Sequence, residues 1–149
     1  MDKYDQFKEH VAISLEKFKE WDKKGTIRLV SHLDADGICA SSIMVRALNT
    51  DNRKYSVSIV SQLTEEVMDG LCKEPYNYFI FTDLGSGQLN YLKKKFIGKQ
   101  ILILDHHQPE KVKLTSNITQ VNPHLFGIDG GKEICGAGVV YLFARSLNK

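Results

Sequence analysis

The sequence contains no apolar run that approaches the roughly 20 residues a helix needs to cross a bilayer. Its first 24 residues are charged throughout and lack the apolar core of a secretory signal peptide. The chain also contains no internal repeat and no low-complexity segment. These absences exclude a membrane-spanning helix, and we expect a cytoplasmic protein that has no membrane partner.

The chain has few cysteines and a small net charge. The three cysteines, Cys39, Cys72 and Cys135, are scattered and form no CxxC pair, which predicts free and mostly buried thiols. The formal net charge is only +2, from 20 basic and 18 acidic residues. A protein that coats duplex DNA is usually far more basic. A nuclease with a basic groove beside an acidic metal site is compatible with this balance.

The 149 residues, 42% of them hydrophobic, are of a size and composition typical of one globular domain. Met1–Lys24 has apolar residues at helical spacing between lysines and glutamates, and Gly25 is a plausible stop. This pattern predicts an N-terminal amphipathic helix that packs on the outside of the main sheet. A helix that docks onto another protein is the alternative.

From Thr26 onward, short apolar runs alternate with helical stretches. The runs predict strands at Ile27–Ser31, Tyr55–Val60, Tyr78–Thr82, Ile101–Leu104 and Asn117–Val121. The stretches between and after them predict helices at Gly37–Leu48, Thr64–Leu71, Gln88–Phe96 and Cys135–Leu147. This alternation predicts an α/β fold: a doubly wound, mainly parallel sheet of about five strands, flanked by helices.

Acidic and histidine residues follow three of the predicted strands, within Ser31–Gly37, Thr82–Gly87 and Leu104–Pro109. The carboxyl ends of parallel strands lie along one edge of a sheet, where ligands bind. We therefore expect four carboxylates and three imidazoles to share a small space. They belong to Asp34, Asp36, Asp83, Asp105, His32, His106 and His107.

Carboxylates this close to one another repel, and divalent cations remove that repulsion. Mixed oxygen and nitrogen ligands suit Mn²⁺ or Mg²⁺, whereas the absence of cysteine from the clusters excludes an all-thiolate site. Seven groups exceed the needs of one ion. They predict two ions about 3.5–4 Å apart, which clamp the oxygens of a phosphoryl displacement and make hydroxide available near neutral pH.

Each cluster also has a purely structural explanation. Asp34 and Asp36 could cap the helix that begins near Gly37, because Asp is a favoured N-cap residue. Asp83 could be a turn residue before Gly-Ser-Gly. Two adjacent histidines after a buried strand have no such structural purpose. His124 follows a predicted strand and could contact a substrate phosphate.

The triplet Asp105-His106-His107 resembles the signature of the DHH phosphoesterase family, and in particular of the archaeal RecJ-like single-strand nucleases. His32-Leu33-Asp34-Ala35-Asp36-Gly37 matches the first motif of the family, and Asp83 in Thr-Asp-Leu-Gly matches the second. The segment Cys135–Tyr141 is similar to the small-residue motif of RecJ-like members. Ordered matches along nearly the whole chain are far more specific than any one motif.

The resemblance implies a metal ligand at five positions. His32 and Asp34 would bind a first ion, and Asp36 and His106 a second. Asp83 would bridge the two ions and would thereby be catalytic as well.

The resemblance also implies catalytic and substrate-binding residues. His107 would contact the scissile phosphate and stabilise developing charge, while Asp105 would orient a neighbouring histidine. Gly136, Ala137 and Gly138 would let the substrate approach closely, and the helix that follows could hold a phosphate at its start.

The family usually has one more metal-binding aspartate, on a strand after the last helix seen here, and a C-terminal domain that grips the substrate. Neither falls within residues 1–149. The resemblance therefore implies that residues 1–149 are the N-terminal part of a DHH phosphoesterase, either as a fragment or as a naturally short protein that borrows the remainder from a partner. In both cases the second metal site is expected to be incomplete, and the activity of this chain alone is in question.

Three functions from different classes fit these residues. The first is an exonuclease that hydrolyses single-stranded DNA or RNA in DNA repair or replication. The second is a replisome scaffold with a GINS partner, against which the retained ligands argue. The third is a cyclic-dinucleotide phosphodiesterase or a pyrophosphatase, although the spacing His32-x-Asp34-x-Asp36 is shorter than the pyrophosphatase motif. Few aromatic residues lie near the motifs, and Tyr78, Phe79 and Phe81 are expected in the core.

Overall fold

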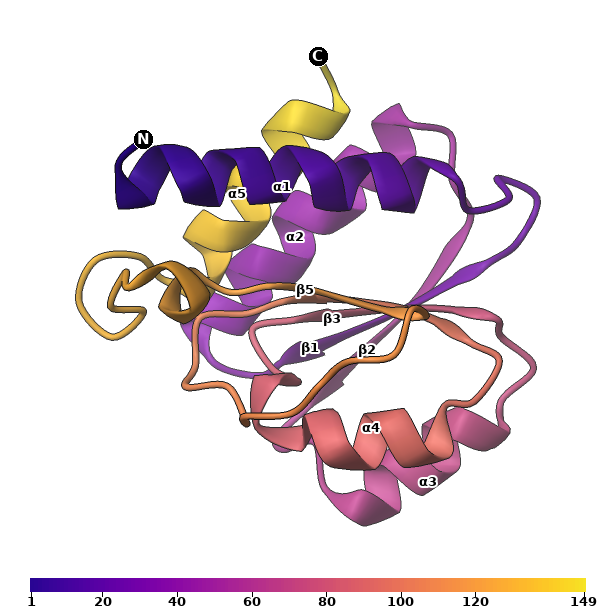
Figure 1. Cartoon of the computed structure of the whole chain (residues 1–149). Coiled ribbons are helices and arrows are strands. Elements are labelled where there is room, and N and C mark those ends of the chain that lie inside the picture. Colours follow the sequence, from indigo (N-terminus) through magenta and orange to yellow (C-terminus); the bar gives the residue numbers. More distant parts are fainter.

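The computed structural model describes all of residues 1–149 and contains one sheet of five parallel strands (Figure 1). The strands are β1 (Ile27–His32), β2 (Tyr55–Val60), β3 (Tyr78–Thr82), β4 (Gln100–Leu104) and β5 (Ile118–Val121). They lie in the order β2-β1-β3-β4-β5, and every neighbouring pair is parallel. The predicted α/β fold with a parallel sheet is confirmed, and strand boundaries differ by at most one residue.

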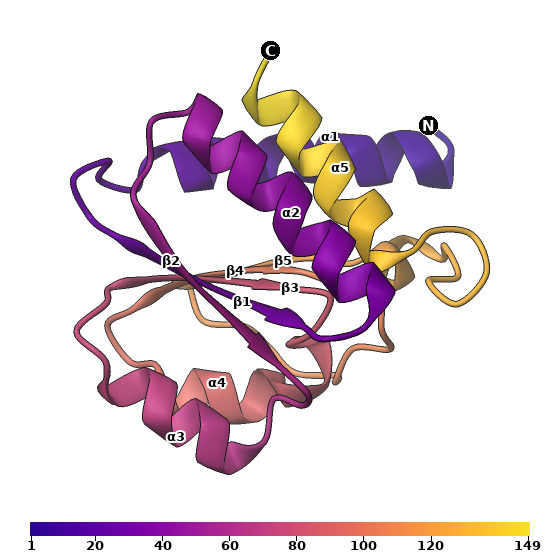
Figure 2. The same ribbon diagram turned by 180° about the vertical axis from the view of Figure 1, so that it is seen from behind.

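Helices cover both faces of the sheet. On one face lie α1 (Lys3–Lys19), α2 (Ala35–Thr50) and α5 (Gly136–Leu147). On the other lie α3 (Glu65–Lys73) and α4 (Leu89–Lys95), as Figure 2 shows from behind. Two short 3-10 helices, η1 (Ser86–Gln88) and η2 (Pro123–Phe126), were not predicted and lie in the loops after β3 and β5.

Strand β3 runs through the centre of the protein and has side chains in both halves of the core. Ile80 packs into the larger apolar cluster, beneath α1, α2 and α5. Phe79 and Phe81 point to the opposite face and pack with Phe96 beneath α3 and α4. Successive strand residues point to opposite faces of a sheet, so a continuous apolar run is what a strand covered on both sides requires. Phe79 and Phe81 are core residues, as predicted.

Helix α1 packs on the outside of the sheet as expected, but it ends at Lys19 and not near Gly25. The chain leaves the helix there because Trp21 turns inward and stacks on the ring of Tyr78, with centroids 5.1 Å apart. Gly25 then passes so close to Tyr78 that a Cβ would collide with the ring. Burial of one aromatic side chain therefore sets the end of this helix.

The three cysteines are free, as predicted, but the expectation that they are mostly buried is wrong. Cys39 lies on the outer side of α2, Cys135 is exposed at the start of α5, and Cys72 is half-buried. None of the helices combines the length and the apolar character that crossing a bilayer demands.

The strand order reverses between β1 and β3, because the chain adds β2 on one side of β1 and all later strands on the other. In parallel sheets, ligands bind at the carboxyl ends of the strands beside such a reversal. His32 ends β1 and Asp83 directly follows β3, so both residues lie at this point.

The core beneath α5 can be tested at Phe143, which is fully buried and makes an edge-to-face contact with Phe18. We expect Phe143→Ala to lower the free energy of unfolding by about 3–5 kcal/mol, because it removes apolar contacts and leaves a cavity. The matched control is Tyr141→Ala in the same helix, whose side chain is 51% exposed. Urea denaturation measures both variants, and equal losses would contradict this packing.

Candidate metal centre

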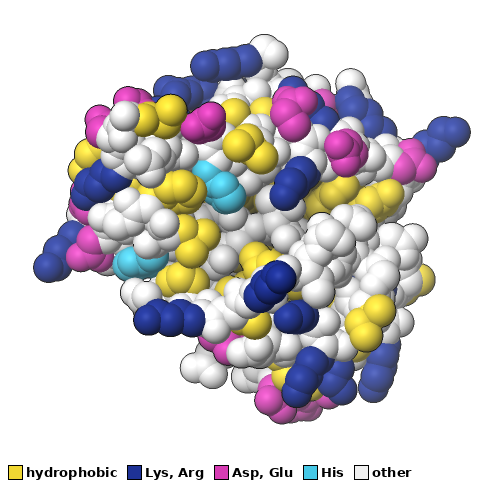
Figure 3. Space-filling view, in the orientation of Figure 1, with side chains coloured by type: hydrophobic (Ala, Val, Ile, Leu, Met, Phe, Trp, Pro, Cys, Tyr) yellow, Lys and Arg dark blue, Asp and Glu magenta, His cyan; other side chains and the backbone are white.

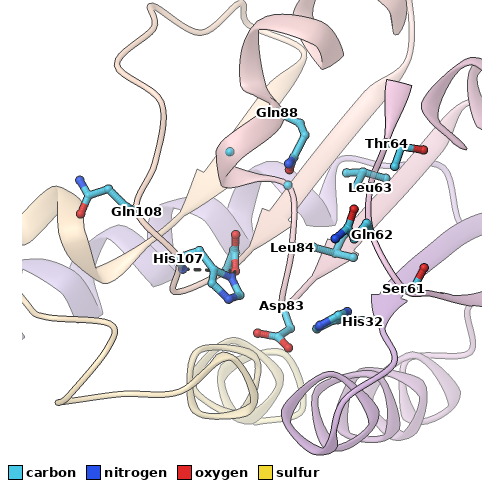
Figure 4. A pocket seen from close by; sticks show the side chains of 13 residues that line it. His32, Ser61, Gln62, Leu63, Thr64, Asp83, Leu84, Gln88, His107 and Gln108 are labelled. Atoms are coloured by element: carbon cyan, nitrogen blue, oxygen red, sulfur yellow. Dashed lines mark hydrogen bonds and ion pairs between the residues drawn. The ribbon is translucent and has the colours of Figure 1, made fainter. Parts of the chain in front are cut away.

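The predicted clusters meet at the carboxyl edge of the sheet. His106 Nε2 lies 3.0 Å from Asp83 Oδ1 and 3.2 Å from Asp36 Oδ2. His32 Nε2 lies 3.4 Å from Asp34 Oδ2. His32, Asp83 and His107 also border one pocket (Figure 4). Residues from the ends of β1, β3 and β4 are thus neighbours in space, although they lie far apart in the sequence.

Each of the three imidazoles of the site is oriented by a contact at its own Nδ1 atom. His106 Nδ1 lies 2.6 Å from the carbonyl oxygen of Gly130, and His107 Nδ1 lies 2.7 Å from Asp105 Oδ1. His32 Nδ1 lies 3.3 Å from the carbonyl of Val60, its partner residue across β1 and β2. Because these acceptors cannot donate, Nδ1 carries the hydrogen in each ring, and Nε2 remains for a ligand. Histidines that bind metals are usually oriented in this way.

Asp83 occupies the most constrained position of the site. Its backbone has φ of 58°, a left-handed conformation that residues other than glycine rarely adopt. Its carboxylate is buried, and apart from His106 Nε2, 3.0 Å from Oδ1, no donor of the chain reaches either oxygen. Burial raises the pKa of Asp83, contact with His106 opposes the rise, and the charge of Asp36 adds to it. A Cβ at Gly136 would collide with this carboxylate, which explains the glycine.

The N-terminus of α5 holds Asp36. The backbone N–H groups of Gly136 and Ala137 donate to its two oxygens, each at 2.8 Å. Burial opposes ionisation, but these two hydrogen bonds hold the pKa of Asp36 below its usual value. Both N–H groups are therefore engaged by a side chain, and the N–H of Gly138 points to Cys135 Sγ. Substrate contact by Gly136, Ala137 and Gly138 stays a prediction.

Asp34 has a structural role that uses only one of its two carboxylate oxygens. Its Oδ1 accepts a hydrogen bond from the N–H of Gly37 at 2.8 Å and caps α2, which is the structural explanation considered above. Its Oδ2 stays free beside His32. A Cβ at Gly37 would collide with the carbonyl of His32, so the helix starts directly against the end of β1. The capping bond therefore fixes Asp34 beside His32.

Asp105 is fully buried and anchors the two adjacent histidines. It accepts hydrogen bonds from the backbone of Ser86 and His106 and from the ring of His107. Burial opposes its charge, but the His107 bond and the backbone bonds hold the pKa of Asp105 below its usual value. The same bond raises the pKa of His107. The His107 side chain remains 54% exposed and faces the pocket.

Three buried polar residues support this segment and were missed in the sequence. Asn122 Nδ2 donates to Ser86 Oγ at 2.9 Å and to the carbonyl of His107 at 2.8 Å. Gln120 Nε2 also donates to Ser86 Oγ, at 3.2 Å. An asparagine between a predicted strand and a proline was the available signal. His124 lies beside Gly130 in the same region, and its contact with a phosphate stays a prediction.

The N-terminus of α1 contributes to the site through a loop. Glu133 accepts hydrogen bonds from Tyr4 at 2.6 Å and Lys3 at 2.9 Å, and also from the N–H of Asp129. Asp129 directly precedes Gly130, whose carbonyl orients His106. Helix α1 thus holds the loop on which the position of His106 depends.

The face of the protein seen in Figure 1 carries charges of both signs. Figure 3 shows lysine and arginine side chains interspersed with acidic ones on the face seen in Figure 1, without a continuous basic stripe. The small net charge of the sequence thus reflects basic and acidic side chains that are both spread over this face.

These residues fit a divalent cation. Two carboxylates and the lone pair of a neutral imidazole would face one another at His106, and only positive charge makes this arrangement stable. A proton supplies that charge when no metal is bound: the contact with Asp83 raises the pKa of His106 to about 9, against burial and with help from Gly130. Asp83, Asp105, His106 and His107 also offer ligand atoms that all lie within 4.8 Å of one another. Oxygen and imidazole donors suit Mn²⁺ or Mg²⁺.

Comparison with protein families gives one match, to the DHH family, N-terminal domain, over residues 26–149. An uncharacterized protein of Methanocaldococcus jannaschii is 40% identical over an alignment of 126 residues that covers 81% of this chain. The chain spans only 29% of the length of that curated relative.

Solved structures of RecJ have the same fold. RecJ from Thermus thermophilus in complex with Mn²⁺ is 25% identical, with a TM-score of 0.70 over 95% of this chain and 20% of its own. An exonuclease RecJ bound to manganese is 25% identical, with a TM-score of 0.72 over 95% of this chain and 37% of its own. CDC45 from Entamoeba histolytica matches the whole chain and 30% of its own, with a TM-score of 0.64, but at 22% identity it shows the fold alone.

Metal addition should stabilise the chain. A ligand that binds only the folded state at about 100 times its Kd adds about 2.7 kcal/mol to the free energy of unfolding. We expect Mn²⁺ to raise the melting temperature, and Asp83→Asn to reduce or remove that rise. The matched control is Asp5→Asn, an exposed residue of α1, which should keep the full rise. Thermal unfolding with Mn²⁺ and with chelator measures the difference. A rise of the same size in Asp83→Asn would contradict the assignment.

The Glu133 contact predicts a pH dependence. Hydrogen bonds from Tyr4 first, and then from Asp129 and Lys3, lower the pKa of Glu133 from 4.5 to about 2. A carboxylate with a lowered pKa stabilises the fold fully above its unfolded value, and the contribution is lost as the pH falls through the folded value. The stability difference between the protein and Glu133→Gln should therefore be constant above pH 4.5 and should narrow toward pH 2. A difference that widens on acidification would disprove the contact.

Proposed function

The chain belongs to the DHH family, and from this we propose that it is the metal-binding domain of a RecJ-like phosphodiesterase that acts on single-stranded DNA or RNA. One observation carries the proposal. The only donor near the buried carboxylate of Asp83 is His106 Nε2, which also contacts Asp36, as expected of a residue that shares cations. The likeness to RecJ structures solved with manganese supports the same conclusion.

In this proposal, five residues would hold two divalent cations, Mn²⁺ or Mg²⁺. His32 and Asp34 would hold one ion, Asp36 and His106 would hold the other, and Asp83 would contribute to both sites. When bound, the ions would supply Lewis acidity and lower the pKa of water.

The chain's own groups then act on the phosphate. His107 donates its Nδ1 hydrogen to Asp105, and its Nε2 faces the pocket. Because Asp105 favours the protonated ring, Nε2–H is available to donate to a phosphoryl oxygen and to offset charge there. Asp105 is the positioning residue that keeps the ring in this orientation, and Asn122 holds the His107 backbone.

The other candidate functions have less support. A replisome scaffold with a GINS partner would need none of these ligands, so retention of the whole set favours hydrolysis. Pyrophosphate or a cyclic dinucleotide remains an alternative substrate. Cleavage of a single strand, cleavage of one of these small molecules, or no cleavage at all distinguishes the three candidates. DNA repair or replication is the proposed cellular role of the nuclease.

The test measures hydrolysis of labelled single-stranded DNA, RNA and a cyclic dinucleotide by the chain in molar excess over substrate, with Mn²⁺ or with chelator. We expect metal-dependent release of nucleotides from a single strand. His107→Ala should lower the rate by about 100-fold or more, because it removes a donor to the phosphoryl group. The matched control, His10→Asn on α1, should retain the rate, since His10 bonds only the carbonyl of Gln120. Absence of metal-dependent cleavage of any strand would contradict the proposal.

A further inference from the structure

A cavity of about 390 Å³ opens directly beside the candidate metal centre. It lies between the loop that joins β2 to α3 and the loop that contains η1 (Figure 4). His32, Asp83 and His107 border one end of it. Its volume is in the range of small-ligand sites, which is about 300–1,000 Å³. Any group bound there would therefore adjoin a phosphate held at the metal centre.

Away from the metal centre, the cavity is lined mainly by amide and hydroxyl side chains and by glycines, with two leucines as its hydrophobic residues. Leu63 and Leu84 are almost fully buried and present apolar surface. Gln88 extends from η1 toward the cavity, and Gln62 also lines it (Figure 4). Neither amide makes a side-chain hydrogen bond within the chain, so their donors and acceptors are free for a ligand.

The lining contains no lysine and no arginine. A second phosphate, as in pyrophosphate, would thus find no cationic side chain in this cavity, although such groups are the usual partners of phosphate. A nucleobase has the opposite requirements. Its faces contact apolar side chains, and its edge exchanges hydrogen bonds with amides such as glutamine.

We propose that this cavity binds the nucleobase of the nucleotide whose phosphate lies at the metal centre. Gln62 and Gln88 contact the edge of the base, and Leu63 and Leu84 contact its face. The inference rests on the proposed function and deepens it, because it names a nucleotide as the group held beside the metal and assigns the base to a defined subsite.

The test compares two probes that differ only in the base, adenosine 5′-monophosphate and ribose 5-phosphate, with the Mg²⁺-loaded chain. Calorimetry measures their affinities, and NMR follows the side-chain amide signals of Gln62 and Gln88. We expect the nucleotide to bind more tightly and to shift both amide signals. Gln88→Ala and Gln62→Ala should each weaken its binding about three- to tenfold, the loss expected for a hydrogen bond, and leave ribose 5-phosphate unchanged.

Gln6→Ala is the matched control, because Gln6 lies on α1 and bonds only the carbonyl of Met1. It should change neither affinity. Equal affinities of the two probes for the unaltered chain would overturn the base subsite while leaving the metal and phosphate site intact. So would an equal loss for both probes in the glutamine variants. Failure of both probes to bind the Mg²⁺-loaded chain would overturn the proposed function as well.

Discussion

The site depends on a single constraint, namely that each of its three imidazoles is fixed through Nδ1 by an acceptor of the fold. The acceptors are the carbonyls of Val60 and Gly130 and the carboxylate of Asp105. They come from the edge strand of the sheet, from the loop held by α1, and from the end of β4. Since Nδ1 is occupied, only Nε2 can bind a cation or donate to a phosphate. The tautomers, and with them the chemistry, follow from backbone positions that the sheet determines.

Two features of the same site are locally unfavourable for folding, and packing by neighbouring residues maintains them. Asp83 has a left-handed backbone and a buried carboxylate whose only nearby donor is His106 Nε2, and both features are unfavourable in isolation. Gly136 makes room for that carboxylate, and the start of α5 engages Asp36 beside it. Violations of local preference such as these are expected where function and not stability selects the residue. The proposed cations would relieve the unfavourable charge that the folded chain creates at Asp83.

Much of this arrangement could be predicted from the sequence. Strong periodicity gave all five strands, and placement of the motifs after strands gave the convergence of the clusters. The end of α1 could not be predicted, because burial of Trp21 against Tyr78 is a tertiary contact. For the same reason, the sequence does not reveal that Gly130 orients His106 or that Asn122 supports His107. Asp34 shows that capping and ligation are compatible, since its two oxygens have different partners.

The most direct test of this account is the anomalous difference map of a crystal of the chain soaked in Mn²⁺. The account predicts manganese bonded to Asp83 together with His32 and Asp34, with Asp36 and His106, or with both pairs, while Nδ1 of His106 stays bonded to Gly130. Manganese bound elsewhere on the protein, with this cluster unchanged and empty, would contradict the account.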